Sequence, residues 1–148
     1  MRSVAIFTFI ILCVAGCRYG GNTSTKPSEP DSGANVEDVS PIAAQAEVSK
    51  AYSQFVDVRT PEEYAAGHAD RAINIPLDIL PANLDRLEKG EPVYLICQTG
   101  RRSKIAAGML KDAGFEKPIN IAGGTDAWKS DGLPMELRSP HSLPQPGP

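Results

Sequence analysis

The stretch YLICQTGRRS, Tyr94–Ser103, sets a cysteine at the end of an apolar run and two arginines shortly after it. An uninterrupted apolar run is typical of a parallel strand that is buried on both faces. Beyond Gly100, apolar residues recur at helical spacing until Gly114. The stretch therefore predicts a buried strand, a short loop that begins at Cys97, and a helix.

The alternation of strand and helix patterns continues on both sides of this stretch. TPEE, Thr60–Glu63, is a capping box with proline at the first helical position, which predicts a helix start. The further predicted elements are helices over residues 41–52, 61–66, 81–90 and 125–130 and strands over residues 54–58, 72–76 and 118–121. Such alternation predicts an α/β domain with a mainly parallel sheet.

The N-terminus has the pattern of an export signal. Arg2 precedes an apolar run over residues 4–16, which is shorter than the roughly 17–25 residues that span a bilayer. The run ends in VAGC at Cys17 and resembles a bacterial lipoprotein signal. The resemblance implies a signal peptide over residues 1–16, a lipid on Cys17, and an exported protein anchored on the periplasmic side of a bacterial membrane. In a plain secretory signal, the alternative, Cys17 has no such role.

Composition separates one domain from its flanks. After Cys17, residues up to 37 are rich in Gly, Ser, Thr, Asn and Pro and predict a flexible tether, and residues 139–148 predict a disordered tail. Residues 38–138 remain as a single folded domain. The net charge is -3, and the chain has no long run of Lys and Arg, so nucleic acid is not an expected partner.

The three cysteines have different expected fates. Cys13 leaves with the signal peptide, Cys17 carries lipid, and Cys97 stays unpaired. Exported proteins normally use cysteines in disulfide pairs. An unpaired thiol in such a protein is either buried and inert or has a chemical role.

The position of Cys97 favours a chemical role. In parallel sheets, sites form at the carboxyl ends of the strands. The loop after Cys97 runs into a helix N-terminus, whose free N–H groups and dipole favour an anion and lower a thiol pKa. Arg101 and Arg102 act in the same direction, and Gly100 permits a close backbone approach or a positive φ. The alternative is a buried core cysteine beside solvated arginines.

Four segments in this order resemble the single-domain rhodanese family over residues 39–134: VDVRTPEEYAAGH, AINIPL, CQTGRRS and AGGTDAWKSDGLP. The resemblance implies a five-stranded, mainly parallel sheet flanked by helices. It implies that Cys97 opens a six-residue loop that ends at Arg102, accepts a sulfane sulfur as a persulfide, and passes it to a thiophilic acceptor. Phosphatase-like relatives have arginine at the position that Ser103 takes here, so the shorter loop favours sulfur over phosphate.

The expected chemistry is transfer of sulfur from thiosulfate to cyanide or a thiol. This transfer needs no proton relay, in keeping with a chain whose histidines are only His68 and His141. Cys97 is the expected nucleophile, the amides of residues 98–102 the cradle, and Arg101 or Arg102 the anion clamp. The substrate-binding residues are therefore Gln98, Thr99, Gly100, Arg101 and Arg102. No metal and no cofactor is expected.

Other matching residues have structural interpretations. Asp57 and Arg59 are expected to form an ion pair, His68 to support the fold, and Trp128 to lie in the core. Family members usually read GHIPGA where this chain reads GHADRA, so residues 69–71 depart from the pattern.

Three alternatives to a thiosulfate sulfurtransferase stay open. One is a carrier of persulfide or polysulfide with a small or protein thiol as acceptor. Another is a non-catalytic binding module, although such modules often lose the cysteine. The third is a thiol redox sensor, which the lack of a resolving cysteine disfavours.

Overall fold

A computed structural model of the chain describes residues 36–137. The predicted signal peptide, the lipidation site Cys17, nearly all of the predicted tether and the predicted tail lie outside the described residues. Within the described range, every helix is too short or too polar to cross a membrane.

The centre of the domain is a five-stranded sheet in the order β1-β6-β5-β2-β4, in which every neighbouring pair is parallel. The strands are β1 (Glu37–Val39), β2 (Gln54–Asp57), β4 (Ile73–Asn74), β5 (Val93–Ile96) and β6 (Pro118–Ile121). All residues of β5 and β6 are buried, as the uninterrupted apolar sequence of β5 predicts for that strand. The prediction of an α/β fold with a five-stranded parallel sheet is confirmed.

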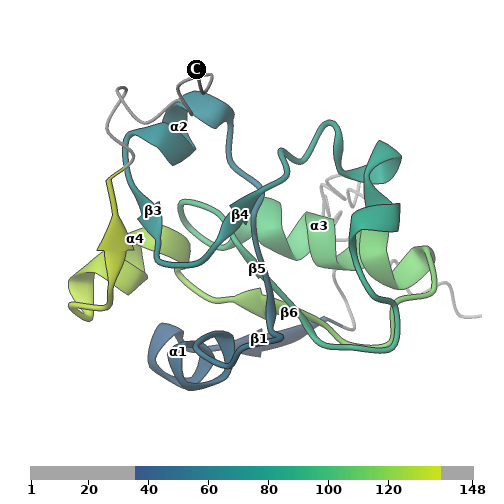
Figure 1. Cartoon of the computed structure of the whole chain (residues 1–148), viewed down its shortest axis with the longest axis horizontal. Helices are drawn as coiled ribbons and strands as arrows, with labels where there is room; N and C mark the ends of the chain where they lie inside the picture. Colours follow the sequence, from purple (N-terminus) through teal and green to yellow (C-terminus); the bar gives the residue numbers. More distant parts are fainter. Residues whose placement is uncertain (1–35, 138–148) are drawn as a thin grey trace, which may run out of the picture.

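Helices cover both faces of this sheet (Figure 1). On one face α1 (Pro41–Val48) and α4 (Gly124–Ser130) contact each other and enclose a core around Trp128. On the other face α3 (Arg101–Asp112) packs on β5 and β6 and encloses a second core that includes Leu95 and Cys97. The cysteine therefore belongs to the α3 side of the sheet.

Side chains cap two of the predicted helix starts. Ser40 caps α1, with Pro41 as its first residue. At α2 (Pro61–Ala65) the Thr60 hydroxyl accepts from the Glu63 amide, and the Glu63 carboxylate accepts from the Thr60 amide. The capping box is thus formed in both directions.

The predicted helix from Pro81 to Gly90 is wrong. The segment forms two 3-10 turns, Leu80–Ala82 and Leu84–Arg86. Asn83 between them leaves the helical conformation (φ -126°, ψ 21°), and its side chain donates to the carbonyl of Ile79. This local hydrogen bond competes with a helix, while both turns still bring leucines to the α3-side core.

Arg71, which replaces the usual family glycine, keeps a glycine-like backbone. Its φ is 68°, the one positive φ of a non-glycine residue in the described range. The guanidinium donates to the carbonyls of Ser49 and Lys50, just beyond the end of α1. Cations are favourable at helix C-termini, so these contacts offset the backbone strain.

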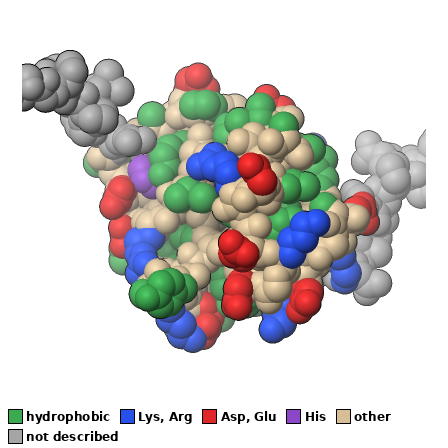
Figure 2. All heavy atoms as spheres, turned by 45° about the vertical axis from the view of Figure 1, so that its right-hand side comes forward, with side chains coloured by type: hydrophobic (Ala, Val, Ile, Leu, Met, Phe, Trp, Pro, Cys, Tyr) green, Lys and Arg blue, Asp and Glu red, His purple; other side chains and the backbone are tan. Residues whose placement is uncertain are grey.

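Charges of both signs alternate over the face shown in Figure 2. Some ion pairs of the described domain join different elements, for example Lys104 of α3 with Asp38 of β1. The described surface on that side therefore lacks the one-signed basic stripe that nucleic-acid binding uses.

Candidate active site

The chain changes direction at the carboxyl ends of β2 and β5. From β2 the chain passes through α2 to β4 on one side, whereas from β5 it passes through α3 to β6 on the other. Such a switch point leaves a crevice between the two loops, and ligands of open α/β sheets bind there. Cys97 follows β5 directly and so lies at this crevice.

Donor groups surround the sulfur of Cys97, which is 1% exposed. The Gly100 amide lies 3.2 Å and the Ser103 hydroxyl 3.3 Å from Sγ. The backbone amides of Thr99 and Ser103 also hydrogen-bond to it. The loop and the first turn of α3 therefore form an anion cradle around the thiol.

This cradle favours the thiolate. Burial is the largest single influence and raises the pKa of Cys97. The hydrogen bond from the Ser103 hydroxyl, followed by those from the amides of Ser103, Thr99 and Gly100, together outweigh burial, so the pKa is lowered from its ordinary value. Cys97 is also a free cysteine.

Backbone hydrogen bonds from α4 hold the loop that begins at Cys97. The Thr125 amide donates to the Cys97 carbonyl at 2.7 Å, and the Asp126 amide donates to the Gln98 carbonyl at 3.0 Å. In a planar trans peptide the N–H points away from the C=O. Since the Gln98 carbonyl faces α4, the Thr99 amide faces the opposite side, where Sγ lies.

Two glycines permit this close contact between the loop and α4. Gly100 has φ 89°, and a Cβ there would lie 3.0 Å from the Gly123 amide nitrogen. Gly124 has φ 58°, and a Cβ there would overlap the Cys97 carbonyl oxygen. Both positions therefore need the conformational freedom and the small size of glycine.

Arg102 is held by an ion pair with Glu63 across the crevice. Its two terminal nitrogens donate to the two carboxylate oxygens at 2.8 and 2.7 Å. Hydrogen bonds from Arg102 lower the pKa of Glu63 to about 2 against the effect of burial, and the Thr60 amide adds to the lowering. The pair therefore stays ionised at any ordinary working pH. Glu63 is the main cause of the raised pKa of Arg102, and Cys97 adds to it, so Arg102 also lies within reach of the thiolate.

The predicted site residues take different places in this arrangement. Cys97, Thr99, Gly100 and Arg102 lie together, whereas the Arg101 side chain is exposed and forms no hydrogen bond or ion pair with another described residue. Gln98 is exposed, and its carbonyl faces α4.

Sequence reasoning missed two contributors to the cradle and its surroundings. Ser103 was predicted only as the residue after the loop, although its hydroxyl and amide both reach Sγ. Glu63 was explained by its role in the capping box, which gave no signal that it also binds an arginine 39 residues later.

The residues with predicted structural roles lie as expected. Arg59 donates to both carboxylate oxygens of Asp57 in a buried ion pair and also to the Gly67 carbonyl. His68 stacks on Tyr64, with ring centroids 3.7 Å apart. Trp128 is fully buried in the α1–α4 core. No group of three His, Cys, Asp or Glu residues within 36–137 is placed to hold a metal ion.

Ser103→Ala should make Cys97 less reactive below neutral pH. Loss of the hydroxyl removes the strongest of the influences that lower the pKa, so the acid limb of the alkylation rate shifts to higher pH. A charge-assisted hydrogen bond is worth about 1.5 kcal/mol, or about ten-fold in thiolate fraction, and the greater nucleophilicity of the remaining thiolate reduces the loss to about three-fold. Iodoacetamide rates against pH measure this. Ser130→Ala, remote from the loop, is the control, and identical profiles for both variants would contradict the assignment.

Comparison with known proteins identifies the family of this domain. The family model of the rhodanese-like domain matches residues 40–131. A sulfurtransferase of Allochromatium vinosum is 35% identical over 81 residues, which cover 55% of this chain and 76% of that protein. The thiosulfate sulfurtransferase GlpE of Vibrio cholerae is 32% identical over 94 residues, which cover 64% of this chain and 89% of that protein. The chain spans less than two thirds of several longer relatives.

A solved structure shows the same fold. The crystal structure of a rhodanese-like domain protein from Staphylococcus aureus matches with a TM-score of 0.62 at 32% identity, covering 70% of this chain and all of that one. The family match extends over more than half of the chain and includes the strand, loop and helix around Cys97. The chain therefore belongs to the rhodanese-like domain family.

Proposed function

We propose that the protein is a sulfurtransferase that moves a sulfane sulfur from thiosulfate to a thiophilic acceptor through a persulfide on Cys97. The observation that carries the proposal is the ring of donors on Sγ: the Ser103 hydroxyl and the amides of Thr99, Gly100 and Ser103. A persulfide carries its negative charge one atom beyond Sγ, where the same donors and Arg102 can stabilise it. Relatives named sulfurtransferases support the reaction class.

The two half-reactions balance without an added oxidant or proton donor. The Cys97 thiolate attacks the outer sulfur of thiosulfate, the S–S bond of thiosulfate breaks, and sulfite leaves with the electron pair. The acceptor then attacks the outer sulfur of the persulfide, and the Cys97 thiolate leaves. With cyanide as acceptor, the product is thiocyanate.

The two loop arginines differ in how much of their positive charge is available to bind a dianion. Glu63 already neutralises Arg102, whereas Arg101 forms no ion pair with another described residue. Arg101 therefore supplies an unpaired positive charge near the loop, and Arg102 supplies oriented N–H groups beside the sulfur.

Arg101→Ala and Arg102→Ala should differ in their kinetics. Charge-assisted contacts are worth about 1.5–3 kcal/mol, so at least one variant should lose about ten-fold or more in kcat/KM for thiosulfate. We expect Arg101→Ala to raise KM mainly at low salt, because exposed charges are screened. Steady-state kinetics at two salt concentrations measure this, with Arg86→Ala as a remote control. Unchanged kinetics for both loop variants would exclude the arginines from donor binding.

Thiocyanate formation from thiosulfate and cyanide by the purified full chain tests the proposal. Turnover by the wild type and none by Cys97→Ser is the expected result. If thiosulfate and mercaptopyruvate both fail as donors while polysulfide loads Cys97, the protein is instead a persulfide carrier. Failure with all three donors would favour the non-catalytic binding module.

We also propose that the protein is exported and anchored to a bacterial membrane by lipid on Cys17. The support is the sequence alone: a short apolar run that ends in VAGC. Cys17→Ala should abolish labelling by radioactive fatty acid and block cleavage before residue 17. Equal labelling of Cys13→Ala and wild type is the matched control, and labelled Cys17→Ala would contradict the anchor.

A further inference from the structure

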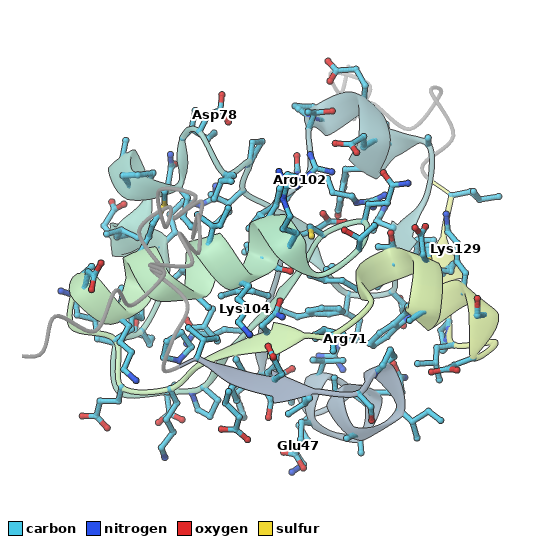
Figure 3. The ribbon with its side chains drawn as sticks, turned by 180° about the vertical axis from the view of Figure 1, so that it is seen from behind. Glu47, Arg71, Asp78, Arg102, Lys104 and Lys129 are labelled. Carbon is cyan, nitrogen blue, oxygen red and sulfur yellow. The ribbon has the colours of Figure 1, made fainter. Side chains whose placement is uncertain are left out.

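A polar pocket of about 200 Å³ adjoins the Cys97 loop and shares Glu63 and Gln98 with the candidate active site. Arg59, Glu63 and Gly67 line it from the β2 side, and Gln98, Thr125 and Lys129 line it from the loop and α4, together with Ala66 and Asp126. Figure 3 shows Lys129 on α4 and Arg102 at the start of α3. The pocket therefore opens beside the crevice at the sheet's carboxyl edge.

Three residues of the pocket wall are linked to Cys97 by the chain, by a hydrogen bond or through Arg102. Gln98 follows Cys97 in the chain, and the Thr125 amide donates to the Cys97 carbonyl. Glu63 binds Arg102, which itself interacts with the thiolate. A small molecule in the pocket thus lies beside the loop that would carry the persulfide.

The pocket wall contains a buried polar atom that the described residues leave without a partner. Thr125 is 1% exposed, and its hydroxyl has no hydrogen-bond partner among the described residues. Arg59 in the same wall is already occupied, because its Nε and Nη2 donate to Asp57 and to the Gly67 carbonyl. Buried polar groups without partners are rare in folded proteins and call for an explanation.

The pocket also presents one free charge of each sign. Asp126 and Lys129 lie three residues apart on α4, yet neither side chain forms an ion pair within residues 36–137. The other two charged groups in the wall are already neutralised, Arg59 by Asp57 and Glu63 by Arg102. A bound molecule with an ammonium beside Asp126 and a carboxylate beside Lys129 and Arg59 would therefore match the charges of the wall.

We propose that this pocket binds the α-amino acid group of a small thiol, which then accepts the sulfur from Cys97. The proposal rests on the sulfurtransferase function and names its acceptor class. The pocket is smaller than the roughly 300–1,000 Å³ of sites for drug-sized ligands, which suits a group the size of one amino acid. Free cysteine and the γ-glutamyl end of glutathione carry the same group.

The test measures transfer from the persulfide of the full chain in single turnovers followed by intact mass. The acceptors are L-cysteine, glutathione, cysteamine, 3-mercaptopropionate, 2-mercaptoethanol and cyanide. Lys129→Met should slow transfer to cysteine and to 3-mercaptopropionate roughly five-fold and leave cysteamine unchanged, because only the first two have a carboxylate. Asp126→Asn should slow cysteine and cysteamine by a similar factor and spare 3-mercaptopropionate. Glutathione shows whether the larger thiol uses the same pocket.

Lys117→Met and Asp112→Asn change the same charges on exposed residues outside the pocket and serve as controls. Cyanide should discharge the persulfide of every variant at the wild-type rate. Equal rates for all thiols in both pocket variants, or losses that include cyanide, would overturn the pocket proposal and leave the sulfurtransferase function standing.

A binding measurement keeps the pocket testable if no persulfide forms. S-methyl-L-cysteine carries the amino acid group but cannot accept sulfur. Its titration should shift the NMR signals of Thr125, Asp126 and Lys129 in the wild type and bind more weakly to Lys129→Met. Absence of these shifts would overturn the pocket proposal independently of catalysis.

Discussion

Cys97→Ser should abolish sulfur uptake and leave the domain folded. A serine hydroxyl is far less acidic than a thiol, so the donors around Sγ cannot generate a nucleophile from it. Thiosulfate treatment should add the mass of one sulfur atom to the peptide that contains Cys97 in the wild type, and cyanide should remove it. The variant should show neither change, and its thiocyanate production should fall to the uncatalysed rate. Kinetics of the wild type should be ping-pong, because sulfite leaves before the acceptor reacts.

The control for Cys97→Ser is the unfolding midpoint in urea, which should change little because serine has nearly the volume of cysteine and keeps the Gly100 and Ser103 partners. Peptide mapping separates Cys97 from Cys13 and Cys17 in the full chain. Sulfur on another cysteine, with Cys97 unmodified, would contradict the assignment of the nucleophile.

Gly124→Ala should damage both stability and the thiol site. The new Cβ would overlap the Cys97 carbonyl oxygen and lie 2.6 Å from the carbonyl carbon of Gln98. Backbone atoms cannot move aside as a flexible side chain can, so we expect a loss of about 3 kcal/mol or more in the free energy of unfolding. Because the loop must shift away from α4, the remaining folded protein should also alkylate more slowly at low pH. Urea unfolding and iodoacetamide rates measure the two effects.

Gly132→Ala separates steric overlap from backbone strain. Gly132 has φ 69°, close to that of Gly124, but a Cβ there meets nothing within 4 Å. The strain alone costs about 1–2 kcal/mol, and the thiol should be unaffected. If both alanine variants lose the same stability and keep the same alkylation profile, contact between α4 and the loop does not shape the site.

The parts of the fold that the sequence predicts are those with strong local signals. The apolar run VYLI predicted β5, and the capping box at Thr60 predicted the start of α2. In contrast, β1 has the polar sequence EDV, and it is a strand because it pairs with β6 some 80 residues later. The two-stranded sheet of β3 (His68–Ala69) and β7 (Met135–Glu136) also joins distant segments, and each strand is only two residues long. Pairing of this kind leaves no periodic pattern to read.

The same distinction holds within the candidate site. Cys97, Gly100 and the arginines are neighbours in the sequence, so the loop could be proposed as a unit. The contacts of Glu63 and Gly124 with this loop depend on how β2, β5 and α4 are arranged in space. In the sequence, Gly124 is simply the second glycine of a pair before a short predicted helix. Its close approach to the Cys97 carbonyl follows from the tertiary structure alone.

The support of the loop by α4 has a consequence for the order of events during synthesis. The chain leaves the ribosome from its N-terminus, so Cys97, the loop and both arginines emerge before Thr125 and Asp126. A nascent chain that ends before Gly124 contains every residue of the loop but lacks the amides that orient the Cys97 and Gln98 carbonyls. The thiol of such a chain should react as an ordinary cysteine, and the rise of its reactivity at acid pH should mark the moment at which α4 docks. The reactivity of the Cys97 thiol thus reports when α4 packs against the loop during folding.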